Sequence, residues 1–157
     1  MRALIQRVER AQVEVDGSVV GSCGEGYLVL LGVAPTDDET LCERLWRKVA
    51  SLRICEDDAG KTNLSLVDTD GDLLVVSQFT LYADARRGNR PSFTGAARPE
   101  LAERLYERFC ELAEAELGAG RVGRGVFGAH MRVSLVNHGP FTVLLDTDEL
   151  GWNSSIS

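Results

Sequence analysis

Short segments in which apolar residues alternate with polar ones, or follow one another without interruption, recur along the chain and predict β-strands. The predicted strands cover residues 3–5, 11–15, 18–20, 27–33, 73–82, 131–136 and 141–146. Asp16 and Gly17 form a tight turn between the second and the third of them. The segment 27–33 is a continuous apolar run, so we expect this strand to be covered on both faces, and we expect 73–82 to be buried as well.

Two further segments carry the apolar stripe of amphipathic α-helices. Thr36, followed three residues later by Glu39, forms a capping box, and the stripe then continues to about Arg53. Pro99 is typical of the first turn of a helix, and Gly118 of the residue that ends one. Because strands outnumber helices and most neighbours are close in sequence, these elements predict an α+β domain. Its sheet is expected to be mainly antiparallel, or a partial barrel, packed by two helices.

No internal repeat, proline-rich linker or low-complexity stretch divides the 157 residues. We therefore expect a single domain over residues 1–157, in which 147–157 form a polar tail that is loosely held apart from Trp152. No apolar run reaches the roughly 18 residues of a membrane span. Residues 1–10 hold three arginines and lack the apolar core of a signal peptide. The sequence thus predicts a cytoplasmic protein without a membrane partner.

Cysteine and histidine are placed unfavourably for a metal site. The four cysteines, at positions 23, 42, 55 and 110, lack the paired spacing of a zinc or redox site, and the two histidines cannot hold a metal alone. We expect buried free thiols, no metal and no other cofactor. The pattern GxGxxG occurs twice within 118–128, but it follows a predicted helix and leads into a strand, the reverse of a dinucleotide site. These glycines are expected to form a loop.

The charge is unevenly distributed. The net charge is −7, yet segments 85–99 and 117–145 contain seven arginines and no acidic residue. The arginines are Arg86, Arg87, Arg90, Arg98, Arg121, Arg124 and Arg132. Such segregation fits a basic face for nucleic acid, or chance clustering in two loops, and charge alone leaves both interpretations open.

Two local features also stay open at this level. Gln78 and Thr80 fall on the same side of the predicted strand 73–82, next to apolar residues. Polar side chains in such surroundings need hydrogen-bond partners, which either a substrate or the pair itself supplies. Gly139 and Pro140 join two predicted strands, and their peptide bond is either an ordinary trans turn or a cis bond that turns main-chain carbonyls outward.

Three motifs together resemble those of the D-aminoacyl-tRNA deacylases. They are SQFTL at 77–81, RPSF at 90–93 and NHGPFT at 137–142, at the separation found in that family. Segments 6–8 and 127–131 are similar to it as well, and the resemblance extends over about residues 1–146. It implies a cytoplasmic homodimer, with active sites at the subunit interface, that hydrolyses the ester joining a D-amino acid to tRNA. Glycine mischarged onto tRNA is implied as a second substrate.

The resemblance also implies roles for particular residues. The Gly139–Pro140 peptide is expected to be cis and to act as a chiral gate that reaches into the active site of the other subunit, with Arg7 fixing its orientation. Phe127 and Met131 are expected to help form a pocket for the terminal adenosine. The residues implied to line the reaction site are Ser77, Gln78, Phe79 and Thr80.

The catalytic step has two candidate forms. Thr80 as a covalent nucleophile needs an adjacent base, and the sequence identifies none. We therefore favour hydrolysis assisted by the 2′-hydroxyl of the tRNA, with residues 77–79 positioning the ester and backbone N–H groups near 79 and 80 stabilising the oxyanion. Two rival functions remain: a dimeric RNA-binding module without catalysis, and a threonine-dependent esterase of small metabolites.

Overall fold

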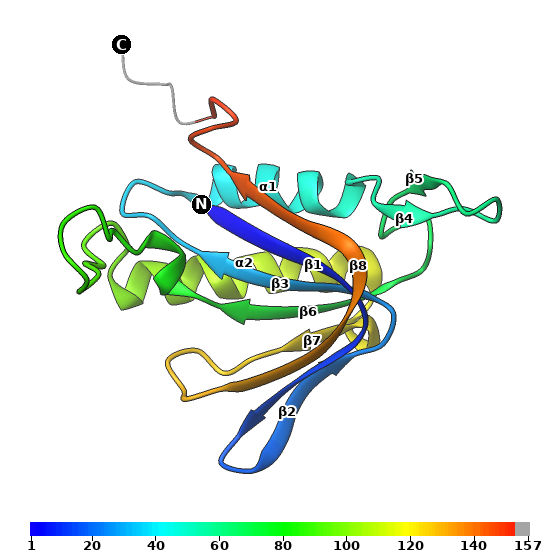
Figure 1. Cartoon of the computed structure of the whole chain (residues 1–157), viewed down its shortest axis with the longest axis horizontal. Coiled ribbons are helices and arrows are strands. Elements are labelled where there is room, and N and C mark those ends of the chain that lie inside the picture. Colours follow the sequence, from blue (N-terminus) through cyan, green and yellow to red (C-terminus); the bar gives the residue numbers. More distant parts are fainter. Residues whose placement is uncertain (153–157) are drawn as a thin grey trace.

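A curved six-stranded sheet, with two α-helices packed against it, forms the centre of the computed structural model over the described residues 1–152 (Figure 1). The strands are β1 (Arg2–Val15), β2 (Ser18–Cys23), β3 (Gly26–Gly32), β6 (Asp72–Ser77), β7 (Val122–Arg124) and β8 (Arg132–Asp146), with a separate hairpin of β4 (Cys55–Glu56) and β5 (Thr62–Leu64). The helices are α1 (Glu39–Ser51), α2 (Pro99–Leu117) and the short 3₁₀-helices η1 (Phe79–Tyr82) and η2 (Ala119–Arg121). This confirms the α+β class.

The sheet is mixed: most of its pairing is antiparallel, as expected, but two strand pairs are parallel. The long strand β1 pairs antiparallel with β2, β3 and β8, whereas β3 with β6 and β6 with β7 are parallel. The parallel pairs arise because α1 lies between β3 and β6 in the chain, and α2 between β6 and β7. Along one edge, the first half of β1 pairs with β3 and the second half pairs with β2. Along its other edge, β1 pairs with β8.

The sheet curls until β2 and β7 nearly close it into a barrel. A Cβ placed on Gly21 would lie 2.2 Å from the carbonyl oxygen of Arg124, and a Cβ on Gly123 would lie 2.3 Å from that of Ser22. The two backbones therefore approach at a distance that only glycine permits. Gly123, which belongs to both GxGxxG patterns, lies in β7 rather than in the expected loop.

The curled sheet encloses apolar side chains on both faces. One face of β1, β3 and β6 packs with α1 and α2 around buried residues such as Ile5, Leu45 and Phe109. On the concave face, Val8, Leu28 and further apolar side chains form a smaller cluster. The apolar run of β3 thus faces a core on each side, as expected for 27–33.

The helix ends follow local chemistry, with one shift. Pro99 occupies the first turn of α2 and Gly118 ends it with a φ of 94°, as predicted. The predicted capping box at Thr36 is wrong by two residues. Asp38 is the N-cap of α1, because its carboxylate accepts a hydrogen bond from the Leu41 N–H over 2.8 Å.

The predicted strand 73–82 ends early, at Ser77. There the partner strand β3 also ends, since Leu31 is opposite Ser77, so no ladder continues for the following residues. The chain instead turns into η1, in which the Leu81 N–H donates to the carbonyl of Gln78 over 3.3 Å. The alternation that placed Gln78 and Thr80 on one strand face was therefore wrong.

The two strands predicted at 131–136 and 141–146 are one continuous strand, β8, with an expanded segment between them. Val8 of β1 is opposite Asn137, and Gln6 is opposite Thr142. Residues 138–141 consequently bulge against the single residue Arg7. This bulge sets the position of the Gly139–Pro140 peptide, which is cis.

The segment after β8 is more firmly held than expected. Thr147 is fully buried: its N–H donates to the carbonyl of Met1 over 3.0 Å, and its hydroxyl accepts from the Met1 ammonium over 2.6 Å. The backbone N–H of Trp152 donates to the carbonyl of Thr147 over 2.9 Å, and the guanidinium of Arg44 lies 4.5 Å from the centre of the Trp152 ring. A loosely held tail is therefore wrong at Thr147, whereas Trp152 is held as expected, and residues 153–157 lie outside the described residues.

Candidate active site

A cavity of about 620 Å³ opens between η1, the start of α2 and the segment that leads into β8. Its volume lies in the range of pockets that bind one small ligand. Elements far apart in the sequence meet here because η1 turns the chain across the end of the sheet, where β3 and β6 stop. The cavity lining includes five of the expected site residues: Ser77, Gln78, Phe79, Phe127 and Met131.

Gln78 and Thr80 are hydrogen-bonded to each other beside this cavity. The side-chain amide of Gln78 donates to the hydroxyl oxygen of Thr80, and its backbone N–H donates to the carbonyl of Leu31 over 2.8 Å. Of the two hydrogen-bond partners that the sequence left open for these side chains, a substrate or each other, the structure shows that they bond to each other. An amide is no base, so within the described chain Thr80 has no hydrogen-bond partner that would activate it as a nucleophile.

A residue that the sequence reasoning missed holds the far end of η1. Arg2 donates from Nη1 to the carbonyl of Leu81 and from Nε to Asp146, each over 2.7 Å, and its guanidinium lies 4.5 Å from the centre of the Tyr82 ring. Burial lowers the pKa of Arg2, but the hydrogen bond and the charge of Asp146 outweigh it and raise the pKa above its ordinary value. The only sequence signal was an arginine directly before the apolar segment 3–5, and it did not point to a partner.

The Gly139–Pro140 segment is held by Arg7, which is almost fully buried. Arg7 donates from Nε to the carbonyl of His138 over 3.0 Å and from Nη2 to the carbonyl of Gly139 over 3.1 Å. The other side of the guanidinium faces the start of the β4–β5 hairpin, where Nη1 donates to the carbonyl of Ile54 over 2.8 Å and Nη2 to Glu56 over 3.3 Å. One planar guanidinium thereby joins two backbone segments in a defined orientation.

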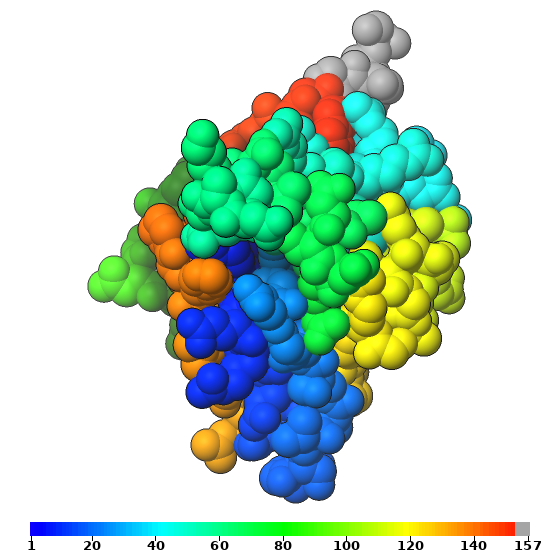
Figure 2. Space-filling model, turned by 90° about the vertical axis from the view of Figure 1, so that its right-hand side faces the viewer, coloured from blue at the N-terminus to red at the C-terminus, as the bar shows by residue number. Residues whose placement is uncertain are grey.

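The two halves of the expected site are separate within one chain. Arg7, Gly139 and Pro140 do not border the 620 Å³ cavity. Arg7 and His138 border a different cavity of about 400 Å³, in the hollow that Figure 2 shows between the orange, teal and blue segments. The loop that follows η1 and the β4–β5 hairpin, which Arg7 contacts, lie at opposite ends of the molecule (Figure 1).

Residues 4–146 match the sequence model of the family described as D-Tyr-tRNA(Tyr) deacylase. The chain belongs to this family. A D-aminoacyl-tRNA deacylase of Deinococcus radiodurans is 57% identical to it over 146 residues, which cover 93% of this chain and 99% of that protein. A D-aminoacyl-tRNA deacylase of Thermomicrobium roseum is 57% identical over 150 residues, 96% of each chain.

Solved structures support the fold of this deacylase-family member. One described as c-Myc DNA Unwinding Element Binding Protein has a TM-score of 0.88 and 39% identity, and the match covers 93% of this chain and 98% of that one. A probable eukaryotic D-amino acid tRNA deacylase has a TM-score of 0.82 with coverage of 92% and 97%. Because the second structure is only 18% identical, it shows the likeness of the fold alone.

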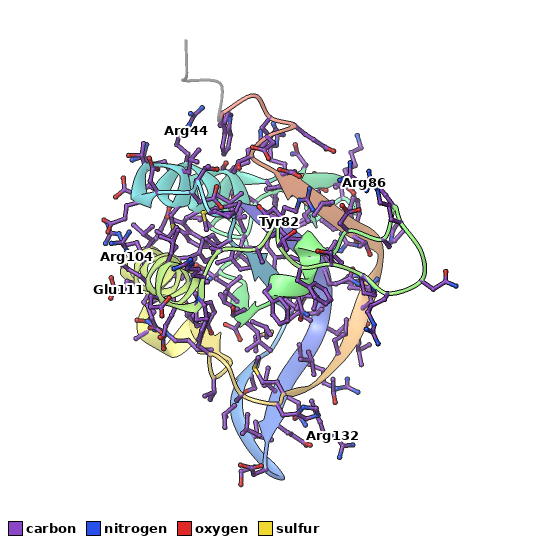
Figure 3. The ribbon with its side chains drawn as sticks, turned by 90° about the vertical axis from the view of Figure 1, so that its left-hand side faces the viewer. Arg44, Tyr82, Arg86, Arg104, Glu111 and Arg132 are labelled. Carbon is purple, nitrogen blue, oxygen red and sulfur yellow. The ribbon has the colours of Figure 1, made fainter. Side chains whose placement is uncertain are left out.

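The arginines expected to form a basic face differ in their surroundings. Arg121 lies 3.5 Å from the carboxylate of Asp70, and Arg124 donates to Glu107 and, over 2.8 Å, to Glu114. Both arginines thus have carboxylate partners within the fold, which makes them weaker candidates for a basic face than arginines without such partners. The exposed arginines without a carboxylate partner among the described residues include Arg87, Arg90 and Arg98, in or beside the loop on which Figure 3 labels Arg86.

The cysteines are buried and reduced in the described chain of this deacylase-family member. Burial raises the pKa of Cys23 to about 11 and the pKa values of Cys42 and Cys110 to about 12. Within residues 1–152, no three His, Cys, Asp or Glu side chains are grouped as they would be to hold a metal ion. None of the described helices has the length and apolar character needed to cross a membrane.

Proposed function

We propose that this chain hydrolyses the ester bond between a D-amino acid and the terminal ribose of tRNA. The observation that carries the proposal is the family match over residues 4–146, together with identities of 57% to two D-aminoacyl-tRNA deacylases. The 620 Å³ cavity supports it because residues 77–79, Phe127 and Met131 meet there around a volume suited to one aminoacyl-nucleoside. The terminal adenosine lies against Phe127 and Met131, and the ester lies at 77–80.

Selection of the D-enantiomer follows from exclusion at Gly139 and Pro140. Rigid main-chain carbonyls accept the α-ammonium of the substrate and leave no space for a side chain on the L side. Arg7 supports this role because its hydrogen bonds fix the carbonyls of His138 and Gly139. Glycine has no side chain, so a glycyl ester passes the same gate.

The complete site is formed by a homodimer, in which the Gly139–Pro140 gate of one subunit enters the cavity of the other. The separation of gate and cavity within one chain supports this arrangement, since both must contact one substrate. The outer edge of β8 also supports it: among the described strands β8 pairs with β1 alone, and its Leu135 and Leu144 are exposed. Dissociation of the dimer is then expected to abolish chiral selection together with activity.

Hydrolysis proceeds with help from the terminal 2′-hydroxyl of the tRNA and without a metal or another cofactor. Thr80 is bonded to an amide and not to a base, which favours this route over a covalent threonine intermediate. The backbone N–H groups of Phe79 and Thr80 lie in the first turn of η1, where no intrahelical acceptor reaches them. They are therefore suited to stabilise the oxyanion.

The acceptor stem is bound mainly through phosphates, without reading of the base sequence. Arg87, Arg90 and Arg98 are the candidate contacts, because they are exposed and carry uncompensated charge in the described structure. We place the reaction in the cytoplasm, where aminoacylated tRNA is used.

The deciding experiment compares hydrolysis of D-Tyr-tRNA and L-Tyr-tRNA by the purified protein in EDTA. We expect rapid loss of the D ester with the L ester intact. Equal hydrolysis of both would contradict the gate. Tight tRNA binding without hydrolysis of either ester would indicate an RNA-binding module. Rapid cleavage of small esters that lack a 2′-hydroxyl would instead indicate a general esterase.

Two further measurements separate the catalytic routes. A substrate ending in 2′-deoxyadenosine is expected to react at least about 10²-fold more slowly, the usual scale of a lost acid–base group. Thr80→Ala is expected to retain near-normal single-turnover hydrolysis. A loss of about 10³-fold or more in Thr80→Ala, with the 2′-deoxy substrate still cleaved, would favour the threonine nucleophile.

A further inference from the structure

Two phenylalanines form an exposed pair at the edge of the 620 Å³ cavity. Phe79 comes from η1 and Phe93 from the loop between η1 and α2, and both border the cavity. Their ring centres are 5.2 Å apart and their planes are inclined at 72°, an edge-to-face contact. Phe79 is 54% exposed and Phe93 36% exposed. Aromatic rings exposed together at a cavity indicate a binding surface, because leaving their apolar area in contact with water is unfavourable and a ligand can cover it.

The loop around Phe93 adds positive charge to this surface. Asp84 and Ser92 are paired through two backbone hydrogen bonds of 2.7 and 2.9 Å, which hold the two ends of the loop together. Arg87 and Arg90 lie between them, exposed and without a carboxylate partner among the described residues, whereas Arg86 is bonded to Asp84. Exposed aromatic rings beside unpaired arginines are the combination that binds single-stranded nucleic acid.

The size of the cavity determines which part of an RNA reaches the rings. If the cavity holds one aminoacyl-nucleoside, as in the proposed function on which this step rests, the preceding nucleotide has to lie outside it. Unpaired RNA bases are commonly bound by stacking on aromatic side chains. Arg87 and Arg90 belong to the same loop as Phe93, so they are the candidate contacts for the phosphates that continue from this nucleotide.

We propose that Phe79 and Phe93 form a stacking platform for the base of the unpaired nucleotide that immediately precedes the terminal adenosine. The platform binds any base, because every base presents a π-face and neither ring offers a hydrogen bond to its edge. It extends recognition by one nucleotide beyond the cavity and aligns the single-stranded end before the ester enters the reaction site.

The test compares two substrates in one variant, Phe93→Leu. The first is a D-tyrosylated RNA minihelix with a single-stranded 3′ end, and the second is D-tyrosyl-adenosine, which lacks the preceding nucleotide. We expect the ratio of kcat/KM for the minihelix to kcat/KM for the nucleoside to fall by about tenfold or more, the scale of one lost base–aromatic stack. Phe93→Trp, which keeps an aromatic face, is expected to retain the wild-type ratio.

Val67→Ala is the matched control, because Val67 is an exposed apolar residue that does not border the cavity. It is expected to leave the ratio unchanged. Equal losses for both substrates in Phe93→Leu would overturn the platform while leaving the proposed function intact. Dissociation of a dimer by Phe93→Leu, measured by sedimentation, would also overturn it, because the rings would then contact a second copy. Failure of the wild-type protein to cleave either D ester would overturn the proposed function itself.

Discussion

The guanidinium of Arg2 donates a hydrogen bond of 2.7 Å to the carbonyl oxygen of Leu81, and so joins the start of β1 to the last turn of η1. Asp146, at the end of β8, holds the same guanidinium from another side over 2.7 Å. Since η1 carries Phe79 and Thr80, this contact connects the central sheet to the proposed reaction site. We therefore expect Arg2 to act as a positioning residue rather than a catalytic one.

Arg2→Gln is expected to lower kcat by about tenfold with a smaller change in KM, because a small displacement of η1 misplaces the ester relative to the amide donors. Single-turnover hydrolysis of a D-aminoacyl-tRNA measures the effect. Arg10→Gln is the control, since Arg10 is exposed and has no ion pair within the described chain. A change in KM alone would contradict a positioning role.

Arg7→Lys is expected to lower the ratio of D-ester to L-ester hydrolysis by about tenfold or more. A lysine cannot donate to the carbonyls of His138 and Gly139 with the fixed geometry of a guanidinium. Glu56→Gln is expected to change the ratio by less than about threefold, since the Glu56 carboxylate is 45% exposed and its ion pair is weak. Both ratios come from parallel assays with the two enantiomeric esters. Loss of stability in Arg7→Lys with unchanged selectivity would indicate a purely structural role.

Gly123→Ala is expected to destabilise the protein by about 2–3 kcal/mol, because its Cβ would overlap the Ser22 carbonyl where the sheet closes. Gly120→Ala is the matched control. No atom lies within 4 Å of a Cβ at Gly120, so its effect is expected to stay within about 0.5 kcal/mol. Urea unfolding of both variants gives the two free energies. Equal free energies of unfolding for the two variants would mean that β2 and β7 can move apart with little loss of stability.

Asp37→Asn is expected to lower the free energy of unfolding by about 3–5 kcal/mol, the cost of leaving one member of a buried ion pair unpaired. The Asp37 carboxylate lies 2.8 Å from the Met1 ammonium, and neither side chain is accessible to solvent. Asp38→Asn provides the comparison, because asparagine caps a helix about as well as aspartate, and it is expected to change stability by about 0.5 kcal/mol or less. Chemical denaturation in one buffer measures both, and similar losses at the two positions would contradict the ion-pair assignment.

Cys42 and Cys110 are expected to resist thiol reagents at pH 8 until the protein unfolds. Burial raises the pKa of each to about 12, so the reactive thiolate is scarce at any pH well below that value, and both side chains are inaccessible. Labelling with a disulfide reagent, in native buffer and in guanidinium chloride, compares the two states. Rapid labelling of these positions in the native protein would show that α1 and α2 open locally.

Local patterns were sufficient for much of the fold. The apolar run at 27–33 and the end of α2 at Gly118 were predicted correctly, because side-chain burial and glycine conformation depend on residues a few positions away. The motifs at 77–81 and 137–142 also pointed to the family that the comparisons confirm. Nothing local, however, indicated that Arg2 contacts Leu81.

The features that the sequence could not predict depend on partners distant in the chain. Residues 78–82 look like a strand, but β6 ends at Ser77 because its neighbour β3 ends there. The bulge at 138–141 exists because these four residues of β8 lie opposite a single residue of β1, Arg7. The charge of Arg124 is paired with a carboxylate because α2 places Glu114 within hydrogen-bond distance of its guanidinium. Local sequence patterns indicate which secondary-structure elements a chain can form. Strand ends, bulges and charge partners depend on the packed tertiary structure, because only packing decides which distant backbone group or charge lies within hydrogen-bond distance.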